Sequence, residues 1–232
     1  HKYRFVNKKI LMDYLVIGYE NHTNETFFEN IFKLEQSHNL IYDLKTNNFE
    51  IKRYYDLKKE EMKLDENSSI ETYKAKLIDA ITLRLRSDVK VGTCLSGGLD
   101  SSSIAAIASS MYKKDSNEKF IAIHAKSSEH DSDESFFAKE VANSSNLDLK
   151  LIEPTKDEFI NSIDDVIYTQ EEPFGGPSIF MQYFVMKKAK EIGCTVLLDG
   201  QGGDETLVGY ERYYPSYLMN LGFFDLIKGF FN

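Results

Sequence analysis

Hydrophobic and polar positions follow one pattern before residue 60 and a different one after residue 68. In the first part, two short stretches at 40–44 and 49–55 are rich in β-branched and aromatic residues, and the polar residues 45–48 separate them. This arrangement predicts an antiparallel hairpin, and we expect residues 1–60 to form a β-rich segment. Residues 58–67 are charged and poor in apolar positions, which predicts a linker.

The second part opens with a helix signal. Residues 68–71, Ser-Ser-Ile-Glu, have the S-x-x-E form of a capping box, in which each side chain satisfies the other residue's free backbone N–H. Apolar residues then recur at helical spacing and form one face: Ile70, Tyr73, Leu77, Ile81 and Leu85. We therefore expect a helix that begins at residue 68.

Short apolar stretches then alternate with helical ones to the end of the pattern. Strands are predicted at 89–95, 120–125, 149–152 and 194–199, and helices at 101–111, 133–144, 156–168 and 178–192, the last ended by Gly193. This alternation is typical of an α/β fold, a doubly wound parallel sheet covered on both faces. Ligands of such sheets bind at the carboxyl ends of the strands. Two glycine-rich turns fall there, after the first and the fourth predicted strand.

Composition narrows the possible partners. The 232 residues are 42% hydrophobic, and 28 Lys and Arg against 37 Asp and Glu give a net charge of −9. That charge argues against nucleic acid as the main partner, and no apolar run approaches the roughly 20 residues of a membrane span. Cys94 and Cys194 lie in separate apolar stretches without metal-ligand spacing, which favours reduced, buried thiols in a cytoplasmic protein. Nothing in the sequence sets the oligomeric state.

Both ends of the chain have the features of a fragment. It begins with His1 and not with Met, and its last residues include an apolar group, Phe223, Phe224, Leu226, Ile227, Phe230 and Phe231, that needs a partner surface. We therefore expect domain boundaries of 1–60 for the β-rich segment and 68–232 for an α/β domain truncated at its C-terminus.

The strongest chemical signal lies between a predicted strand and a predicted helix. Residues 95–102 have the sequence Leu-Ser-Gly-Gly-Leu-Asp-Ser-Ser. Glycines let the backbone turn sharply and approach a ligand closely, and a helix N-terminus attracts anions. Asp100 beside phosphates is suited to holding Mg²⁺. The string lacks the G-K-[ST] and G-x-G-x-x-G patterns of the two commonest phosphate loops. The alternative is a turn in which Asp100 only caps the helix; the whole string in this position favours a phosphate site.

The same residues resemble a known family. Residues 96–102 look like the pyrophosphate loop of ATP pyrophosphatases. Residues 199–210, Asp-Gly-Gln-Gly-Gly-Asp-Glu-Thr-Leu-Val-Gly-Tyr, resemble the S-G-E-G-x-D-E-x-x-x-G-Y motif of asparagine synthetases. Residues 172–174, Glu-Pro-Phe, resemble the D-E-P-F loop of those enzymes, and residues 133–142 match the helix after their second strand. Residues 26–57 resemble the stretch that leads out of their glutaminase domain, so the resemblance covers nearly the whole chain.

The resemblance implies an adenine-nucleotide α-hydrolase-like, Rossmann-like fold and an ATP-dependent former of amide bonds. A substrate carboxylate attacks the α-phosphate of ATP, and ammonia or glutamine-derived nitrogen then displaces AMP. The resemblance assigns ATP to Leu95, Ser96, Gly97, Gly98, Asp100, Ser101, Ser102, Ile123, Asp199 and Gly200. It assigns Mg²⁺ to Asp100 and Asp204, and catalysis to Asp100, Glu172, Gln201 and Asp204. The most direct expectation is asparagine synthesis from aspartate.

Three departures from the family pattern keep other functions open. Gln201 stands where the family has Glu, and an amide cannot take a proton from the attacking ammonia. Gly175 and Gly176 stand where the family often has an acidic residue, in the loop expected to line the acceptor pocket. The N-terminal Cys of the glutaminase domain and a catalytic Lys of the distal helices have no counterpart here. We therefore keep two alternatives: the same adenylation of another carboxylate, as in a polysaccharide amidotransferase or a peptide cyclase, and a nucleotide-binding module without turnover.

Overall fold

The computed structural model describes residues 5–56, 62–115, 118–127 and 133–221. By their contacts, residues 1–66 and 162–179 form one unit, which we call the hairpin unit. Residues 67–161 and 180–232 form the other, the sheet unit. These units are groups of contacts, and the domain boundaries expected at 60 and 68 stay a prediction. The C-terminal apolar group from Phe223 to Phe231 lies outside the described residues.

The hairpin unit contains the predicted hairpin and a helix that the pattern did not predict. Strands β1 (His38–Asp43) and β2 (Asn48–Arg53) pair antiparallel, with Leu40 opposite Ile51. Helix α1 (Lys8–Ile17) begins after Asn7, whose side chain accepts a hydrogen bond from the Ile10 amide, and ends at Gly18 in the left-handed region. Helix α6 (Ile163–Gln170) completes the unit.

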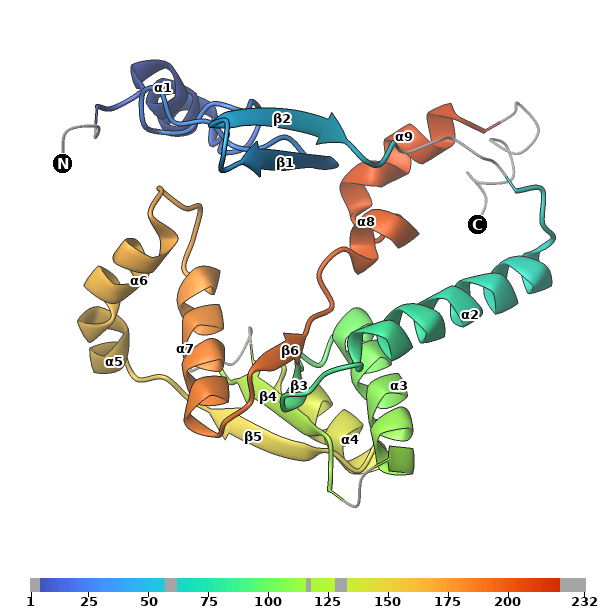
Figure 1. The fold of residues 1–232 in the computed structure, drawn as a ribbon. Coiled ribbons are helices and arrows are strands. Elements are labelled where there is room, and N and C mark those ends of the chain that lie inside the picture. The colour runs from blue at the N-terminus through green and yellow to red at the C-terminus, as the bar shows by residue number, and fades with distance from the viewer. Residues whose placement is uncertain (1–4, 57–61, 116–117, 128–132, 222–232) are drawn as a thin grey trace. The chain divides into compact units, whose positions relative to one another are not determined.

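The sheet unit is built on four parallel strands in the order β5-β4-β3-β6 (Figure 1). Their bounds are β3 Val91–Cys94, β4 Ile121–Ala125, β5 Asp148–Ile152 and β6 Val196–Leu198. The chain runs outward from β3 through β4 to β5 and then returns to the other side of β3 at β6. The strand order therefore reverses between β3 and β6, which is where doubly wound sheets bind ligands. The predicted α/β fold with a parallel sheet is confirmed.

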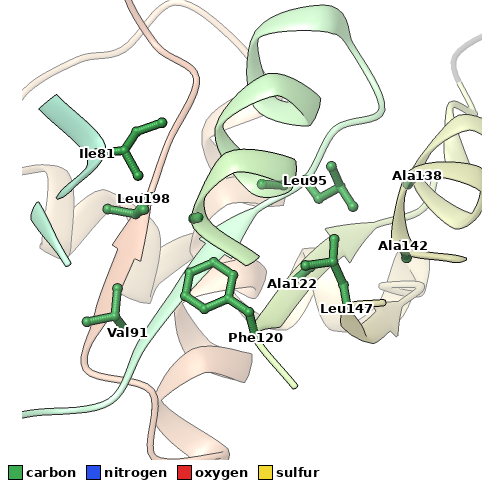
Figure 2. Packing of buried hydrophobic residues seen from close by; sticks show 11 residues of the cluster. Ile81, Val91, Leu95, Phe120, Ala122, Ala138, Ala142, Leu147 and Leu198 are labelled. Atoms are coloured by element: carbon green, nitrogen blue, oxygen red, sulfur yellow. The ribbon is translucent and has the colours of Figure 1, made fainter. Parts of the chain in front are cut away.

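Helices cover both faces of this sheet, as the alternation of side chains along each strand requires. On one face Ala122 and Phe120 pack with residues of helices α2 (Glu66–Arg84), α3 (Leu99–Asp115) and α4 (Ser135–Ser144), a cluster drawn in Figure 2. On the other face Ile121 and Ile123 pack against Val185 and Ala189 of helix α7 (Ser178–Glu191).

Three helix predictions need correction. Helix α2 begins at Glu66, so Ser68 lies inside its first turn and the predicted capping box is wrong. Only the C-terminal part of its apolar face is buried: Ile81 is 3% exposed, whereas Ile70 is 54% exposed. The helix predicted at 156–168 is two helices, α5 (Lys156–Asn161) and α6, which meet at the buried Ser162. Helix α3 begins two residues earlier than predicted and ends at Asp115.

The remaining described elements follow β6. They are the short helix α8 (Gly203–Leu207), a single 3-10 turn (Glu211–Tyr213) and helix α9 (Tyr214–Met219). In the part of the chain that the structure describes, no helix has the length and apolar character that crossing a membrane requires.

Candidate functional site

The first glycine-rich turn connects the end of β3 to the start of α3 in four residues, 95–98. Gly97 has a φ of 98°, in the region that favours glycine. A Cβ at this position would lie 3.0 Å from the Glu134 oxygen and from the Ala138 nitrogen, at the start of α4. The loop therefore passes so close to α4 that only glycine fits without displacing the neighbouring backbone.

Two serines hold this loop in shape. The Ser96 and Ser101 hydroxyl oxygens lie 2.8 Å apart, and the Ser101 hydroxyl also accepts a hydrogen bond from the Ser96 amide at 3.2 Å. The Gly98 amide donates to the Ser96 hydroxyl at 3.2 Å. Because α3 begins at Leu99, its first backbone N–H groups have no acceptor inside the helix. The Ser101 hydroxyl itself donates to the Gly98 carbonyl oxygen at 3.2 Å. The first amides of α3 thus lie beside two serine hydroxyls at the positive end of a long helix, which suits a phosphate group.

The second glycine-rich turn, residues 199–202, packs directly against the first. A Cβ at Gly200 would lie 2.8 Å from the Ser101 nitrogen, and a Cβ at Gly203 would overlap the Asp100 carboxylate. The Asp100 side chain is therefore next to the backbone of Gly203, one residue before Asp204. Both turns follow strand ends at the point where the strand order reverses, so the fold itself brings the two motifs together.

The two turns line one cavity of about 610 Å³. Eight of the residues predicted from sequence lie on its wall: Ser96, Gly98, Asp100, Ser101, Asp199, Gly200, Gln201 and Asp204. The wall also contains seven other residues of the two quoted motifs: Leu99, Gly202, Gly203, Glu205, Leu207, Gly209 and Tyr210. Three lining residues lie outside those motifs: Cys94, Glu134 and Gln182.

Four predicted ATP-binding residues do not line this cavity. Leu95 and Ile123 are each 1% exposed, with side chains in the two core clusters, and the Leu95 amide donates a hydrogen bond to the Ile123 carbonyl oxygen. Gly97 lies against α4, and the Ser102 hydroxyl is buried without a hydrogen-bond partner among the described residues. Their roles stay predictions.

Glu172 belongs to the hairpin unit. Its carboxylate accepts a hydrogen bond from the Lys33 ammonium at 2.8 Å, and the Lys33 ammonium also donates to the Asn21 side-chain oxygen at 2.7 Å. The Tyr14 hydroxyl donates to the Phe174 carbonyl oxygen at 2.9 Å. The loop that resembles D-E-P-F is thus anchored to the N-terminal residues. The catalytic role expected for Glu172 stays a prediction.

The cavity wall is acidic. It contains five carboxylates, Asp100, Glu134, Asp199, Asp204 and Glu205, and no Lys or Arg among the described residues that line it. A polyphosphate in such a cavity requires a cation to offset the repulsion. The described part of the chain contains no cluster of three or more side chains able to hold a metal by themselves. Mg²⁺ usually binds through one or two carboxylates together with substrate phosphates, so Asp100 and Asp204 fit that ion.

Cys94 forms part of the same wall. Burial and, to a smaller extent, the negative charge of Asp199 together raise the pKa of its thiol to about 11. The Gln182 side-chain amide, from α7, lies 3.9 Å from the Cys94 sulfur. Both cysteines are free, as expected, but Cys94 is only half-buried. Its position directly before Leu95 was the one signal in the sequence that could have placed it here.

His124 is a further residue that the sequence analysis did not assign to this region. It is 4% exposed, and its Nδ1 lies 2.7 Å from the carbonyl oxygen of Leu95, the first residue of the first glycine-rich turn. Its Nε2 has no hydrogen-bond partner within the described ranges. A histidine in an otherwise apolar strand was the available signal.

Comparison with protein families shows which family has these two glycine-rich turns. The model of the family "Asparagine synthase" matches residues 72–228, which include both glycine-rich turns. The chain belongs to the asparagine synthase family. The family resemblance of the motifs is therefore confirmed, and the two turns that line the cavity are those of an asparagine synthase domain.

Curated relatives cover most of this chain. A putative glutamine-hydrolysing asparagine synthetase 2 of Methanocaldococcus jannaschii is 33% identical over 218 residues, which are 93% of this chain and 41% of the relative. Asparagine synthetase 1 of Bacillus subtilis is 29% identical over 164 residues, 70% of this chain and 25% of that protein. An amidase of Penicillium rubens is 25% identical over 82% of this chain and 30% of its own. The chain thus spans less than half the length of these relatives.

Solved structures are less similar. A U34-tRNA thiolase from Methanococcus maripaludis matches 66% of this chain and 55% of its own at 20% identity, with a TM-score of 0.45. An NH3-dependent NAD synthetase from Campylobacter jejuni matches 60% of each chain with a TM-score of 0.39. The description of the fold therefore rests on the topology of this sheet.

Proposed function

We propose that the protein is an ATP-dependent ligase that forms amide bonds through an acyl-adenylate. The observation that supports this most directly is the packing of two glycine-rich turns at the switch point of the sheet, with the Asp100 carboxylate against Gly203 in an acidic cavity. In the proposed reaction a substrate carboxylate attacks the α-phosphate of ATP and releases pyrophosphate. An amine then attacks the carbonyl carbon and releases AMP.

Six residues of the cavity wall have a part in this proposal. Ser96, Ser101 and the first amides of α3 bind the pyrophosphate, and the hydrogen bonds between the two serines keep these donors in place before the nucleotide arrives. Asp100 and Asp204 would hold Mg²⁺, which neutralises the charge that develops on the leaving pyrophosphate. Gly200 and Gly203 leave room for the two turns to approach each other.

Within this class we propose asparagine synthesis from aspartate, with nitrogen from glutamine or ammonia. Two of the relatives are named as glutamine-hydrolysing asparagine synthetases, one of them putative, which supports this choice. A second candidate is adenylation of a different carboxylate, because Gln201 and the glycines at 175 and 176 depart from the family pattern and because the relatives include amidases. The partners are small molecules in both cases.

Product analysis on the full-length protein distinguishes these candidates. The protein is incubated with Mg²⁺-ATP, a panel of carboxylates that includes aspartate, and ammonia or glutamine. AMP and pyrophosphate that appear together with asparagine support asparagine synthesis, whereas AMP that appears only with another carboxylate supports the second candidate. Asp100→Asn is expected to abolish both products. ADP and phosphate in place of AMP and pyrophosphate would contradict adenylation.

A further inference from the structure

The first glycine-rich turn begins with a peptide group that is held at both of its ends. This is the peptide group between Leu95 and Ser96, and because a peptide group is planar, its carbonyl oxygen and its N–H move together. The N–H of Ser96 donates to the Ser101 hydroxyl at 3.2 Å. The carbonyl oxygen of Leu95 lies 2.7 Å from the Nδ1 atom of His124. The orientation of this peptide group therefore depends on a side chain of β4 as well as on the loop itself.

The end of the pairing between β3 and β4 explains why the Leu95 oxygen needs a side-chain donor. Cys94 lies opposite Ile123 in the sheet, and the Leu95 amide donates to the Ile123 carbonyl oxygen at 2.9 Å. The chain then turns away from β4, and no backbone amide of the described ranges donates to the Leu95 oxygen. A buried carbonyl oxygen is rarely left without a donor. The imidazole of His124 supplies that donor.

The surroundings of His124 leave its ring with this one hydrogen bond. The residue is 4% exposed and lies two positions after Ala122, on the face of β4 that packs against α3 and α4. A carbonyl oxygen only accepts hydrogen bonds, so the Nδ1 atom carries the proton. The Nε2 atom has no hydrogen-bond partner in the part of the chain that the structure describes. A substitution at His124 therefore tests its contact with Leu95.

The peptide group connects this contact to the two serines of the loop. The Ser101 hydroxyl accepts from the Ser96 amide, donates to the Gly98 carbonyl oxygen at 3.2 Å and lies 2.8 Å from the Ser96 hydroxyl oxygen. If the peptide group rotates, the Ser96 amide leaves the Ser101 hydroxyl, and both hydroxyls lose their fixed directions. Ser96 and Ser101 line the cavity, whereas His124 does not. A contact outside the cavity thus sets the geometry of groups on its wall.

We propose that His124 is a positioning residue for the phosphate loop. This inference rests on the proposed function, because it requires that Ser96 and Ser101 bind the pyrophosphate portion of ATP. The Nδ1–H group of His124 keeps the peptide group between Leu95 and Ser96 in place before the nucleotide arrives. Pre-organisation of this kind raises affinity, because less conformational freedom is lost on binding. The effect concerns the β- and γ-phosphates, so AMP does not benefit from it.

The test compares three ligands and two substitutions in the full-length protein, by calorimetric titration. His124→Leu removes the Nδ1–H group, whereas asparagine has an N–H donor on its Cγ atom, where histidine has Nδ1. His124→Leu is expected to weaken binding of Mg²⁺-ATP and of Mg²⁺-pyrophosphate by about 10–100-fold and to leave binding of AMP unchanged. His124→Asn is expected to bind all three ligands like the wild type, although the smaller side chain also lowers Tm. A role in stability alone would make the affinities follow Tm.

A second histidine provides the matched control. The Nδ1 atom of His38 lies 2.8 Å from the Gln36 carbonyl oxygen, in the hairpin unit. His38→Leu removes the same kind of hydrogen bond and is expected to change the affinity for each ligand by less than about twofold.

A double variant tests the route through the peptide group. In Ser101→Ala the Ser96 amide has already lost its acceptor, so adding His124→Leu is expected to cause little further loss of pyrophosphate affinity. Losses that add fully would overturn this route.

The remaining outcomes separate the two proposals. Wild-type affinity of His124→Leu for Mg²⁺-pyrophosphate, or an equal loss for AMP, would overturn the role of His124. Nuclear magnetic resonance of the wild type with isotope-labelled histidine is expected to show a proton on the Nδ1 atom of His124, and an unprotonated Nδ1 would overturn the role without any variant. If the wild type binds neither Mg²⁺-ATP nor Mg²⁺-pyrophosphate, the proposed function fails as well.

Discussion

The close packing of the two glycine-rich turns predicts that two neighbouring glycines respond differently to the same added methyl group. A Cβ at Gly200 would lie 2.8 Å from the Ser101 nitrogen, and ordinary contact begins at 3.4 Å, so the turns must separate by about 0.6 Å. A Cβ at Gly203 would instead meet the carboxylate of Asp100, the end of a side chain that can rotate. The added methyl group at Gly200 thus meets backbone atoms, whereas the one at Gly203 meets a side chain.

We therefore expect Gly200→Ala to lower the free energy of unfolding by about 1–3 kcal/mol, the usual cost of overpacking. For a chain of this size each kcal/mol lowers Tm by about 2–4 °C. Gly203→Ala is expected to leave Tm nearly unchanged but to weaken binding of Mg²⁺-ATP by at least about tenfold. The Asp100 carboxylate must leave its place, and a hydrogen bond or ion contact to a charged group contributes about 1.5–3 kcal/mol.

Thermal unfolding followed by circular dichroism and calorimetric titration with Mg²⁺-ATP measure the two effects separately. Gly176→Ala is the control, since a Cβ there would meet nothing within 4 Å and Gly176 is not left-handed. It should leave Tm and binding unchanged, or raise Tm slightly. An unchanged Tm in Gly200→Ala, or wild-type binding in Gly203→Ala, would refute the reasoning about which atoms meet.

Three further predictions concern the described contacts. Because burial and the Asp199 charge hold the pKa of Cys94 near 11, alkylation of Cys94 should be slow at pH 7 and should accelerate up to about pH 11. Asp199→Asn should lower this pKa and speed alkylation of Cys94 at pH 8. Mass spectrometry measures the alkylation rate, with Cys194 as the internal reference. His124→Leu leaves the Leu95 carbonyl oxygen without its 2.7 Å partner and should cost about 1–3 kcal/mol in urea unfolding; an unchanged midpoint would contradict this. Lys33→Ala removes the contact to Glu172 and should change the free energy of unfolding by less than about 1 kcal/mol. The same variant should speed amide hydrogen exchange in residues 171–176. Lys33→Arg should keep the slower exchange of these amides.

The strands of the sheet unit were predictable because each is a short apolar stretch flanked by helical ones. Successive side chains of a strand point to opposite faces of the sheet. Strand β4 therefore contributes to both hydrophobic clusters, with Ala122 in one and Ile121 in the other. The first turn was predictable from its string of small residues, and the second from its resemblance to a family motif. These signals are local in sequence, and the order of strands then brings them together.

The unpredicted features depend on contacts between distant residues. Helix α1 has an Asn before it and a Gly after it, but it lies in the segment, residues 1–60, that was expected to be β-rich. The end of α5 at Asn161 has no glycine or proline to mark it. The pairing of Lys33 with Glu172 joins residues 139 positions apart. No periodicity in the sequence reports such pairs, because the partners share neither an element nor a motif.

The anchoring of the loop at 171–176 has a consequence for the order of events during synthesis. Glu66 ends the first segment of the hairpin unit and Ser162 begins the second, so the 95 residues 67–161 lie between them. At about 5–20 residues per second, the ribosome takes roughly 5–20 s to supply the second segment. During that interval Lys33 and Tyr14 are without Glu172 and Phe174. The nascent hairpin unit is therefore incomplete until β3, β4 and β5 have been translated.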